Sequence, residues 1–225
     1  MNVLVIAAHP DDEVLGAGGA IARHTQNNDT VTTVILGSGL SSRLEAHEAL
    51  EQQDLAQLHK EAKLAASALG VTDLRLFDFP DNRFDRVDLL DIVKIIEAVA
   101  DEVQPAIVYT HHPGDLNIDH QRTAMATLTA CRPLPGSSVQ RILAMEVASA
   151  TGWGDPALPF IPNVFLDISS VMKNKLEAMA AYQGELRQFP HARSLPSLEA
   201  RAKAWGSQVG IEAAEPFVLL REVLS

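Results

Sequence analysis

The sequence predicts an α/β protein, a Rossmann-like three-layer α/β/α sandwich with a mostly parallel sheet. Short apolar runs rich in β-branched residues alternate with amphipathic helical segments over residues 1–150. Strands connected through helices form right-handed crossovers, which produce parallel pairing. The length of 225 residues is also sufficient to bury a substantial core.

The first part of the chain is expected to hold five strands and four helices in alternation. Strands are expected at 2–8, 31–36, 73–79, 106–110 and 141–147, where short apolar runs occur. Helices are expected at 14–27, 44–69, 87–103 and 119–130, where apolar residues recur at three- and four-residue steps. Gly70 and Pro105 mark the ends of the second and third helices.

The sequence changes character after about residue 150. A loop punctuated by prolines precedes a short strand expected at 164–167, and helices are expected at 170–186 and 195–206. A closing strand is expected at 217–221. We interpret the chain as a single domain over residues 1–225, in which residues 151–225 complete a Rossmann-like core formed by residues 1–150.

Composition excludes several function classes. The formal net charge of -11 and the pI of about 5.1 argue against a nucleic acid or an anionic membrane as partner. With Cys131 as its single cysteine, the chain has no intrachain disulfide. No stretch reaches the roughly 20 apolar residues of a membrane span, and no signal peptide is recognisable. We therefore expect a cytoplasmic protein without a membrane span.

Two polar clusters follow the first and fourth predicted strands. The first is His9-Pro-Asp-Asp-Glu13, and the second covers residues 111–120. In a doubly wound sheet, the direction of winding reverses between these two strands, and ligands bind at their carboxyl ends. The two clusters are therefore expected to face one another across a crevice.

These residue types are suited to metal-dependent hydrolysis. Catalytic zinc sites typically have three protein ligands, often imidazoles and carboxylates, and one open position. His9 and Asp12 can supply two ligands from one tight turn, and His120 can supply the third. Asp11 then lies beside the metal as a carboxylate able to take a proton from an attacking water. Iron or cobalt can also occupy such a site.

Two simpler explanations compete with this metal site. The glycines at positions 16, 18 and 19 follow a strand, as in a dinucleotide-binding loop, but their spacing is not G-x-G-x-x-G. Acids in the preceding turn would also repel a phosphate, so close packing of a helix on the sheet explains these glycines better. Asp11 or Asp12 can serve as a helix cap, although the added His120 and the sheet topology favour the metal site.

The neighbours of the predicted ligands are expected to have supporting roles. Glu13 is expected to orient the loop or a ligand histidine rather than to bind the metal. Asp119 is interpreted as a helix cap or a partner of a ligand, and Asp115 as a loop residue or an orienting group for a histidine. Cys131 is expected to be a buried thiol without a catalytic role.

At these residues the chain resembles the zinc-dependent de-N-acetylases of the LmbE/PIG-L type. The motif AHPDDE, joined to the later Asp-His pair at 119–120, is the signature of that family. The segments FPDNRFD, YTHHPGDLNIDH and PNVFLDIS resemble a bacterial branch associated with surface-polysaccharide and nucleotide-sugar metabolism. The resemblance implies a Rossmann-like fold, a homo-oligomer and removal of acetyl from an N-acetylated amino sugar, which releases acetate and a free amine.

The resemblance also implies a role for each site residue. The three predicted ligands hold Zn2+, and Asp11 is the general base, which can later return its proton to the leaving amine. Many relatives carry a histidine three positions before the ligand histidine, where it stabilises the oxyanion. This chain has Asn117 at that position, so either Asn117 donates a hydrogen bond to the oxyanion or His112 reaches in from the same loop.

Substrate-binding residues are implied in the same way. Relatives hold sugar hydroxyls with an Arg and an Asp from the loops after strands two and three, where this chain has Arg43 and Asp81 or Arg83. In some relatives a C-terminal histidine completes the site, sometimes from a neighbouring subunit, and His191 is the candidate here.

The predicted substrate is therefore an N-acetylated sugar or nucleotide sugar. The alternatives are hydrolysis of another amide, such as a thiol-sugar conjugate or an antibiotic precursor, or, in a different class, a non-catalytic nucleotide-binding module.

Overall fold

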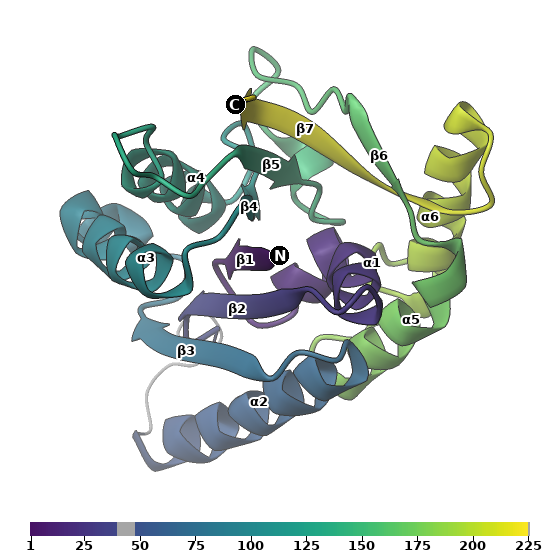
Figure 1. Cartoon of the computed structure of the whole chain (residues 1–225). Helices are drawn as coiled ribbons and strands as arrows, with labels where there is room; N and C mark the ends of the chain where they lie inside the picture. The colour runs from purple at the N-terminus through teal and green to yellow at the C-terminus, as the bar shows by residue number, and fades with distance from the viewer. Residues whose placement is uncertain (40–47, 225) are drawn as a thin grey trace.

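A seven-stranded sheet forms the centre of the computed structural model, which describes residues 1–39 and 48–224 (Figure 1). The strand order is β3-β2-β1-β4-β5-β7-β6. The strands are β1 (Asn2–Ala7), β2 (Thr30–Gly37), β3 (Asp73–Phe79), β4 (Ile107–His111), β5 (Arg141–Met145), β6 (Val164–Asp167) and β7 (Ala214–Glu222). The predicted α/β class is confirmed.

The direction of winding reverses between β1 and β4. Strands β1 to β5 pair in parallel, whereas β7 runs antiparallel to both β5 and β6. Strands β1 and β4 are direct neighbours, so their carboxyl ends lie side by side. The two polar clusters therefore follow adjacent strands, as the sequence predicts.

Six α-helices surround the sheet. They are α1 (Asp12–Gln26), α2 (Glu48–Ala68), α3 (Leu89–Val103), α4 (Ile118–Ala130), α5 (Met172–Ala181) and α6 (Leu195–Val209) within the described part of the chain. The predicted end of the helix at 170–186 is wrong, because α5 stops at Ala181. Tyr182 leaves the helical conformation with ψ 71°, and its fully buried side chain turns toward α1.

Two apolar layers hold the helices on opposite faces of the sheet. Alternate residues of β1 point into each layer, with Val3 and Val5 on one side and Leu4 and Ile6 on the other. Helices α1, α2, α5 and α6 cover the first side, and α3 and α4 cover the second (Figure 1). A strand buried on both faces is uniformly apolar, which explains the run that starts the sequence.

The glycines of α1 allow the helix to lie against its neighbours. A Cβ atom on Gly16 would lie 2.6 Å from the sulfur of Met145, and one on Gly19 would lie 2.5 Å from Cγ2 of Ile168. A side chain at either position would require these neighbours or the helix to move. This close packing agrees with the interpretation of the glycines made from the sequence.

A buried ion pair connects α1 to the C-terminal part of the chain. Nζ of Lys175, on α5, lies 2.6 Å from Oε1 of Glu215, on β7. The Glu215 carboxylate accepts the backbone N–H groups of Gly19 and Ala20, and the Lys175 ammonium donates to the carbonyl of Leu15. The pair thus bonds to backbone groups in the middle of α1, so the last strand helps to shape the helix that follows the first.

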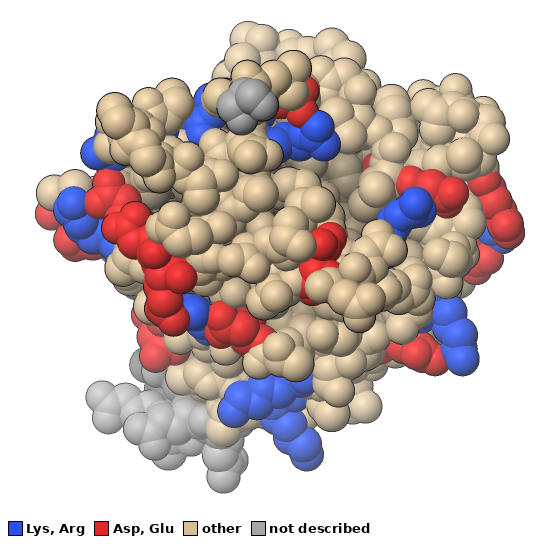
Figure 2. Space-filling view, viewed as in Figure 1, with Lys and Arg blue, Asp and Glu red and all other residues tan. Residues whose placement is uncertain are grey.

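Charged side chains are dispersed on the face of the molecule shown in Figure 2. Described Lys and Arg side chains lie near Asp and Glu side chains there, without forming a continuous basic surface. Among the described helices, none is both long enough and apolar enough to cross a membrane.

The Lys175→Met variant tests the buried pair. It leaves the Glu215 carboxylate buried without its cation, so the free energy of unfolding should fall by about 3–5 kcal/mol. Urea denaturation followed by circular dichroism measures this change. Lys173→Met, on the exposed side of the same helix, is the control and should change stability by less than about 0.5 kcal/mol. Equal stabilities of the two variants would contradict the assigned role.

Candidate metal centre

The turn between β1 and α1 directs two predicted ligands to the same side. Asp11 adopts a left-handed backbone conformation with φ 96°, which is uncommon for a residue other than glycine and concentrates at functional sites. Asp12 then begins α1. Its Oδ2 accepts the backbone N–H of His9 at 2.9 Å and lies 3.2 Å from Nδ1 of the same histidine.

His120 meets this pair from α4. Its Nε2 lies 3.1 Å from Oδ2 of Asp12. One ligand atom from each of His9, Asp12 and His120 can be chosen so that all three lie within 4.8 Å of one another, and all three residues are buried. The structure therefore brings together the three residues predicted as metal ligands.

A carboxylate supports each imidazole from the side away from Asp12. Nε2 of His9 lies 2.9 Å from Oδ2 of Asp119, and Nδ1 of His120 lies 3.1 Å from Oδ1 of Asp115. In histidines that bind metals, the second ring nitrogen almost always donates a hydrogen bond to such an acceptor, which fixes the tautomer and the ring orientation. This arrangement leaves Nδ1 of His9 and Nε2 of His120 directed toward Asp12.

The supporting carboxylates are held by their own partners. Asp119 accepts the backbone N–H groups of Asn82 at 2.5 Å and Phe84 at 2.9 Å, which connects α4 to the loop after β3. Asp115 accepts the hydroxyl of Thr151 at 2.6 Å. Asp119 is thus a partner of a histidine and not the helix cap, since Asn117 caps α4.

A second group of possible ligands shares His9. It consists of His9, Asp81 and Asp119, and Oδ1 of Asp81 lies 3.0 Å from Nε2 of His9. This group has one imidazole, and its Asp119 already accepts two backbone N–H groups. The group with two imidazoles is the better zinc site, because each of its histidines has a separate supporting carboxylate.

The charges of the cluster favour a cation between the imidazoles. Burial lowers the pKa of His9, but hydrogen bonds with Asp119, Asp12 and Asp81 raise it well above the usual value. Burial also opposes charge on His120, whereas Asp12 and Asp115 raise its pKa to about 9. Burial raises the pKa of Asp12, and the two histidines lower it well below its usual range. Positive charge is thus stabilised where a metal ion would lie.

His111 is a neutral neighbour of the centre. Its Nε2 accepts the backbone N–H of Ala8 at 2.8 Å, and its ring stacks on that of His120 with centroids 4.0 Å apart. Burial and the charge of His120 lower its pKa to about 3. Its role is to pack beside a ligand and to connect β4 to β1.

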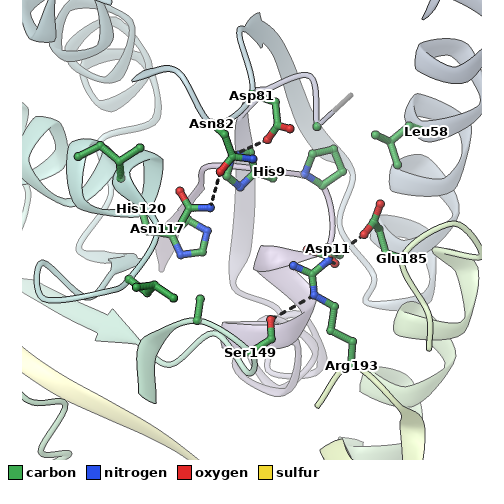
Figure 3. A pocket seen from close by; sticks show the side chains of 15 residues that line it. His9, Asp11, Leu58, Asp81, Asn82, Asn117, His120, Ser149, Glu185 and Arg193 are labelled. Carbon is green, nitrogen blue, oxygen red and sulfur yellow. Dashed lines mark hydrogen bonds and ion pairs between the residues drawn. The ribbon is translucent and has the colours of Figure 1, made fainter. Parts of the chain in front are cut away.

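A cavity of about 480 Å³ opens onto the centre (Figure 3). His9, Asp11 and His120 form part of its wall. Burial raises the pKa of the Asp11 carboxyl, the charge of Arg193 lowers it, and the net pKa is well above its usual value. The cavity therefore contains a carboxylate beside two of the candidate ligands, which is the arrangement that proton transfer near a metal requires.

Two further predicted residues lie in the wall of this cavity. Asp81 comes from the loop after β3, and Asn117 comes from the start of α4. The side-chain oxygen of Asn117 accepts the backbone N–H of Asp119, and its nitrogen donates to Oδ1 of Asn82 at 3.1 Å (Figure 3). Asn117 therefore presents an amide nitrogen as its donor at the cavity.

The other predicted residues are placed differently. His112, Arg83 and His191 are not among the described residues of the cavity wall. His112 accepts the N–H of Gly114, and its ring packs against Phe160. Arg83 and His191 are exposed, the former beside a one-turn helix and the latter on the loop between α5 and α6. Arg43 lies outside the described residues.

The sequence did not predict three residues of the cavity wall, which are Arg193 beside Asp11 and its partners Glu185 and Ser149. Nη1 of Arg193 lies 2.9 Å from Oδ2 of Asp11 and 2.8 Å from Oε2 of Glu185, and its Nε donates to the hydroxyl of Ser149 at 3.2 Å (Figure 3). Arg193 lies two positions after His191, which the resemblance implied from the same segment. The loop around it has no regular period from which its orientation could be predicted.

Residues 4–131 match the family model PIG-L, described as GlcNAc-PI de-N-acetylase. The chain belongs to this family. A relative from Bacillus anthracis, named probable N-acetyl-alpha-D-glucosaminyl L-malate deacetylase 2, is 28% identical over 187 residues, which are 82% of this chain and 81% of the relative. The diacetylchitobiose deacetylase of Thermococcus kodakarensis is 27% identical over 223 residues, which are 95% of this chain and 81% of the relative.

A solved structure extends the comparison of this PIG-L protein to its whole length. The 4-carboxy-2-hydroxymuconate hydratase of Pseudomonas putida superposes with a TM-score of 0.80 and 25% identity, over 100% of this chain and 98% of that chain. The family and its named relatives assign this protein to the hydrolytic N-deacetylases. The hydratase shows that the same fold also carries another reaction.

Substitution of a supporting carboxylate should weaken metal binding. Asp115→Asn removes the charge behind His120, so zinc affinity should fall about 10–100-fold, as measured by competition with a chromogenic chelator. Asp101→Asn, an exposed substitution on α3, is the control and should bind zinc as the unmodified protein does. Unchanged affinity in the Asp115 variant would argue against zinc at His120.

Proposed function

We propose that this PIG-L protein is a zinc-dependent hydrolase that removes an acetyl group from an N-acetylated amino sugar or its conjugate. The observation that carries the proposal is the convergence of two carboxylate-supported imidazoles on Asp12, with Asp11 in the wall of the adjoining cavity. The names of the relatives support derivatives of N-acetylglucosamine as the first substrates to test.

His9, Asp12 and His120 would hold the zinc ion. Two imidazoles and a carboxylate form a three-ligand set that leaves a position open, as in catalytic zinc sites. When bound, zinc would supply Lewis acidity, which lowers the pKa of water and polarises an amide carbonyl. Asp119 and Asp115 would keep the two imidazoles in the tautomers that this set requires.

Asp11 would transfer the proton of the reaction. Its carboxylate would take a proton from water as that water attacks the acetyl carbon, and would then give the proton to the leaving amine nitrogen. The products would be acetate and a free amino sugar. The side-chain nitrogen of Asn117, in the cavity wall, would donate a hydrogen bond to the oxygen of the tetrahedral intermediate. The contacts of His112 with Gly114 and Phe160 favour a structural role for that residue.

The described cavity wall favours a neutral sugar ring, rather than carboxylates, beside Asp11 and Asp81. Asp11, Asp81 and Glu185 contribute three acidic side chains, and Arg193 pairs with two of them. A substrate with several carboxylates, as the name of the related hydratase implies, would meet repulsion there. A neutral sugar can instead hydrogen-bond to Asp81 through its hydroxyls. Nucleotide sugars and other amides remain the alternative substrates.

The proposal is tested by metal analysis together with acetate release. N-acetylglucosamine, diacetylchitobiose, an N-acetylglucosaminyl malate and a nucleotide-linked N-acetylglucosamine form the panel. About one zinc per chain is expected, along with acetate from at least one member of the panel, loss of activity on chelation and recovery on zinc addition. A metal-free protein after reconstitution would refute the zinc site. A protein that binds zinc but releases no acetate from the panel would indicate that its substrate is another amide.

The Asp11→Asn variant tests the proton-transfer role. An amide cannot accept the proton, so kcat should fall by about 10²–10⁴-fold, whereas zinc content should stay at the level of the unmodified enzyme. Acetate release and metal analysis on the same samples measure both quantities. Asp91→Asn, an exposed change at the start of α3, is the matched control. Full activity of Asp11→Asn would refute the mechanism.

A further inference from the structure

We infer that Arg193 is a positioning residue for Asp11, and that the segment from Tyr182 to Arg193 fixes this residue at both its backbone and its carboxylate. The inference rests on the proposed function, because it assigns this segment a part in the same reaction. The segment lies outside residues 4–131, the part of the chain that matches the family model.

The backbone of Asp11 is held through Glu13. The N–H of Asp11 donates to Oε2 of Glu13 at 3.1 Å, and the hydroxyl of Tyr182 donates to Oε1 of the same carboxylate at 2.5 Å. Tyr182 and Glu13 are both buried. Tyr182 therefore fixes the carboxylate that in turn holds the strained turn at Asp11.

The side chain of Asp11 is held through Arg193. Nη1 of Arg193 lies between Oδ2 of Asp11 and Oε2 of Glu185, and Nε donates to the hydroxyl of Ser149. Glu185 is itself buried. A guanidinium is planar and carries its donors in a fixed fork, so contacts at Nε and Nη1 define its orientation. Figure 3 shows the guanidinium beside Asp11 at the cavity.

This contact decides which oxygen of Asp11 faces the reaction. Because Oδ2 is engaged by Arg193, we assign Oδ1 to the water in the cavity. A general base must lie within hydrogen-bond reach of the proton it takes, at about 2.6–3.2 Å. A misplacement of about 1 Å can cost about 10²-fold in rate. A fixed carboxylate therefore supports turnover more than it supports substrate binding.

An alternative role for Arg193 is to bind an anionic group of the substrate. The contacts of its guanidinium make this role less favourable, because two carboxylates and a hydroxyl already engage it. A substrate anion would have to displace at least one of them. The two roles differ in which kinetic constant depends on Arg193.

The experiment compares Arg193→Ala, Arg193→Lys and the control Arg132→Ala in the acetate-release assay, with zinc content measured on every sample. Arg132 is exposed, lies outside the segment from Tyr182 to Arg193 and pairs with Glu97. For Arg193→Ala, kcat should fall about 10²-fold, with KM within about threefold of its original value and zinc retained. The kcat of Arg193→Lys should lie between those of Arg193→Ala and the unmodified enzyme. Added guanidinium should partly restore the kcat of Arg193→Ala. The control should match the unmodified enzyme.

Two kinetic results would overturn the inference. Full kcat in Arg193→Ala would remove the positioning role, and a rise in KM at unchanged kcat would assign Arg193 to substrate binding. A crystal structure of Arg193→Ala provides a readout independent of substrate, in which the Asp11 carboxylate should rotate from its present orientation. An unchanged carboxylate would also overturn the inference. Absence of acetate release by the unmodified enzyme would instead refute the proposed function.

Discussion

The buried carboxylate of Asp12 is the constraint on which the rest of the centre depends. Removing a carboxylate from water costs several kcal/mol unless positive charge and hydrogen bonds offset the loss. At Asp12 the compensation comes from the backbone N–H of His9 and from two imidazoles with raised pKa values. The imidazoles in turn require their own carboxylates, Asp119 and Asp115. A network of alternating charge thus extends from α1 to α4.

The sheet makes this network possible by placing its two halves side by side at the ends of β1 and β4. Strands β1 and β4 are adjacent, and both enter the site from the interior of the protein. Their carboxyl ends deliver His9 and His120 from sequence positions far apart. The left-handed turn at Asp11 then divides two consecutive aspartates between two tasks. Asp12 faces the histidines, and Asp11 faces the cavity.

The fold and the candidate ligands could be predicted because both follow from local patterns. The periodicity of apolar residues and the expected strand order predicted that His9, Asp12 and His120 lie at one crevice, without any knowledge of side-chain contacts. Residues on irregular loops had no such pattern. His191 and Arg193 are two positions apart, yet only Arg193 reaches the cavity, because the path of the loop decides which side chain points inward. The same limit explains His112, which the loop after β4 turns toward Phe160.

The contact between Lys175, Glu215 and α1 has a consequence for the order in which the protein is made. Synthesis delivers β1 and α1 first, whereas Glu215 belongs to the last strand. While a nascent chain is being extended at about 5–20 residues per second, the Glu215 carboxylate is absent until most of the chain has been made. Helix α1 can therefore form its own turns early, but it can make these contacts with β7 only after Glu215 has been synthesised.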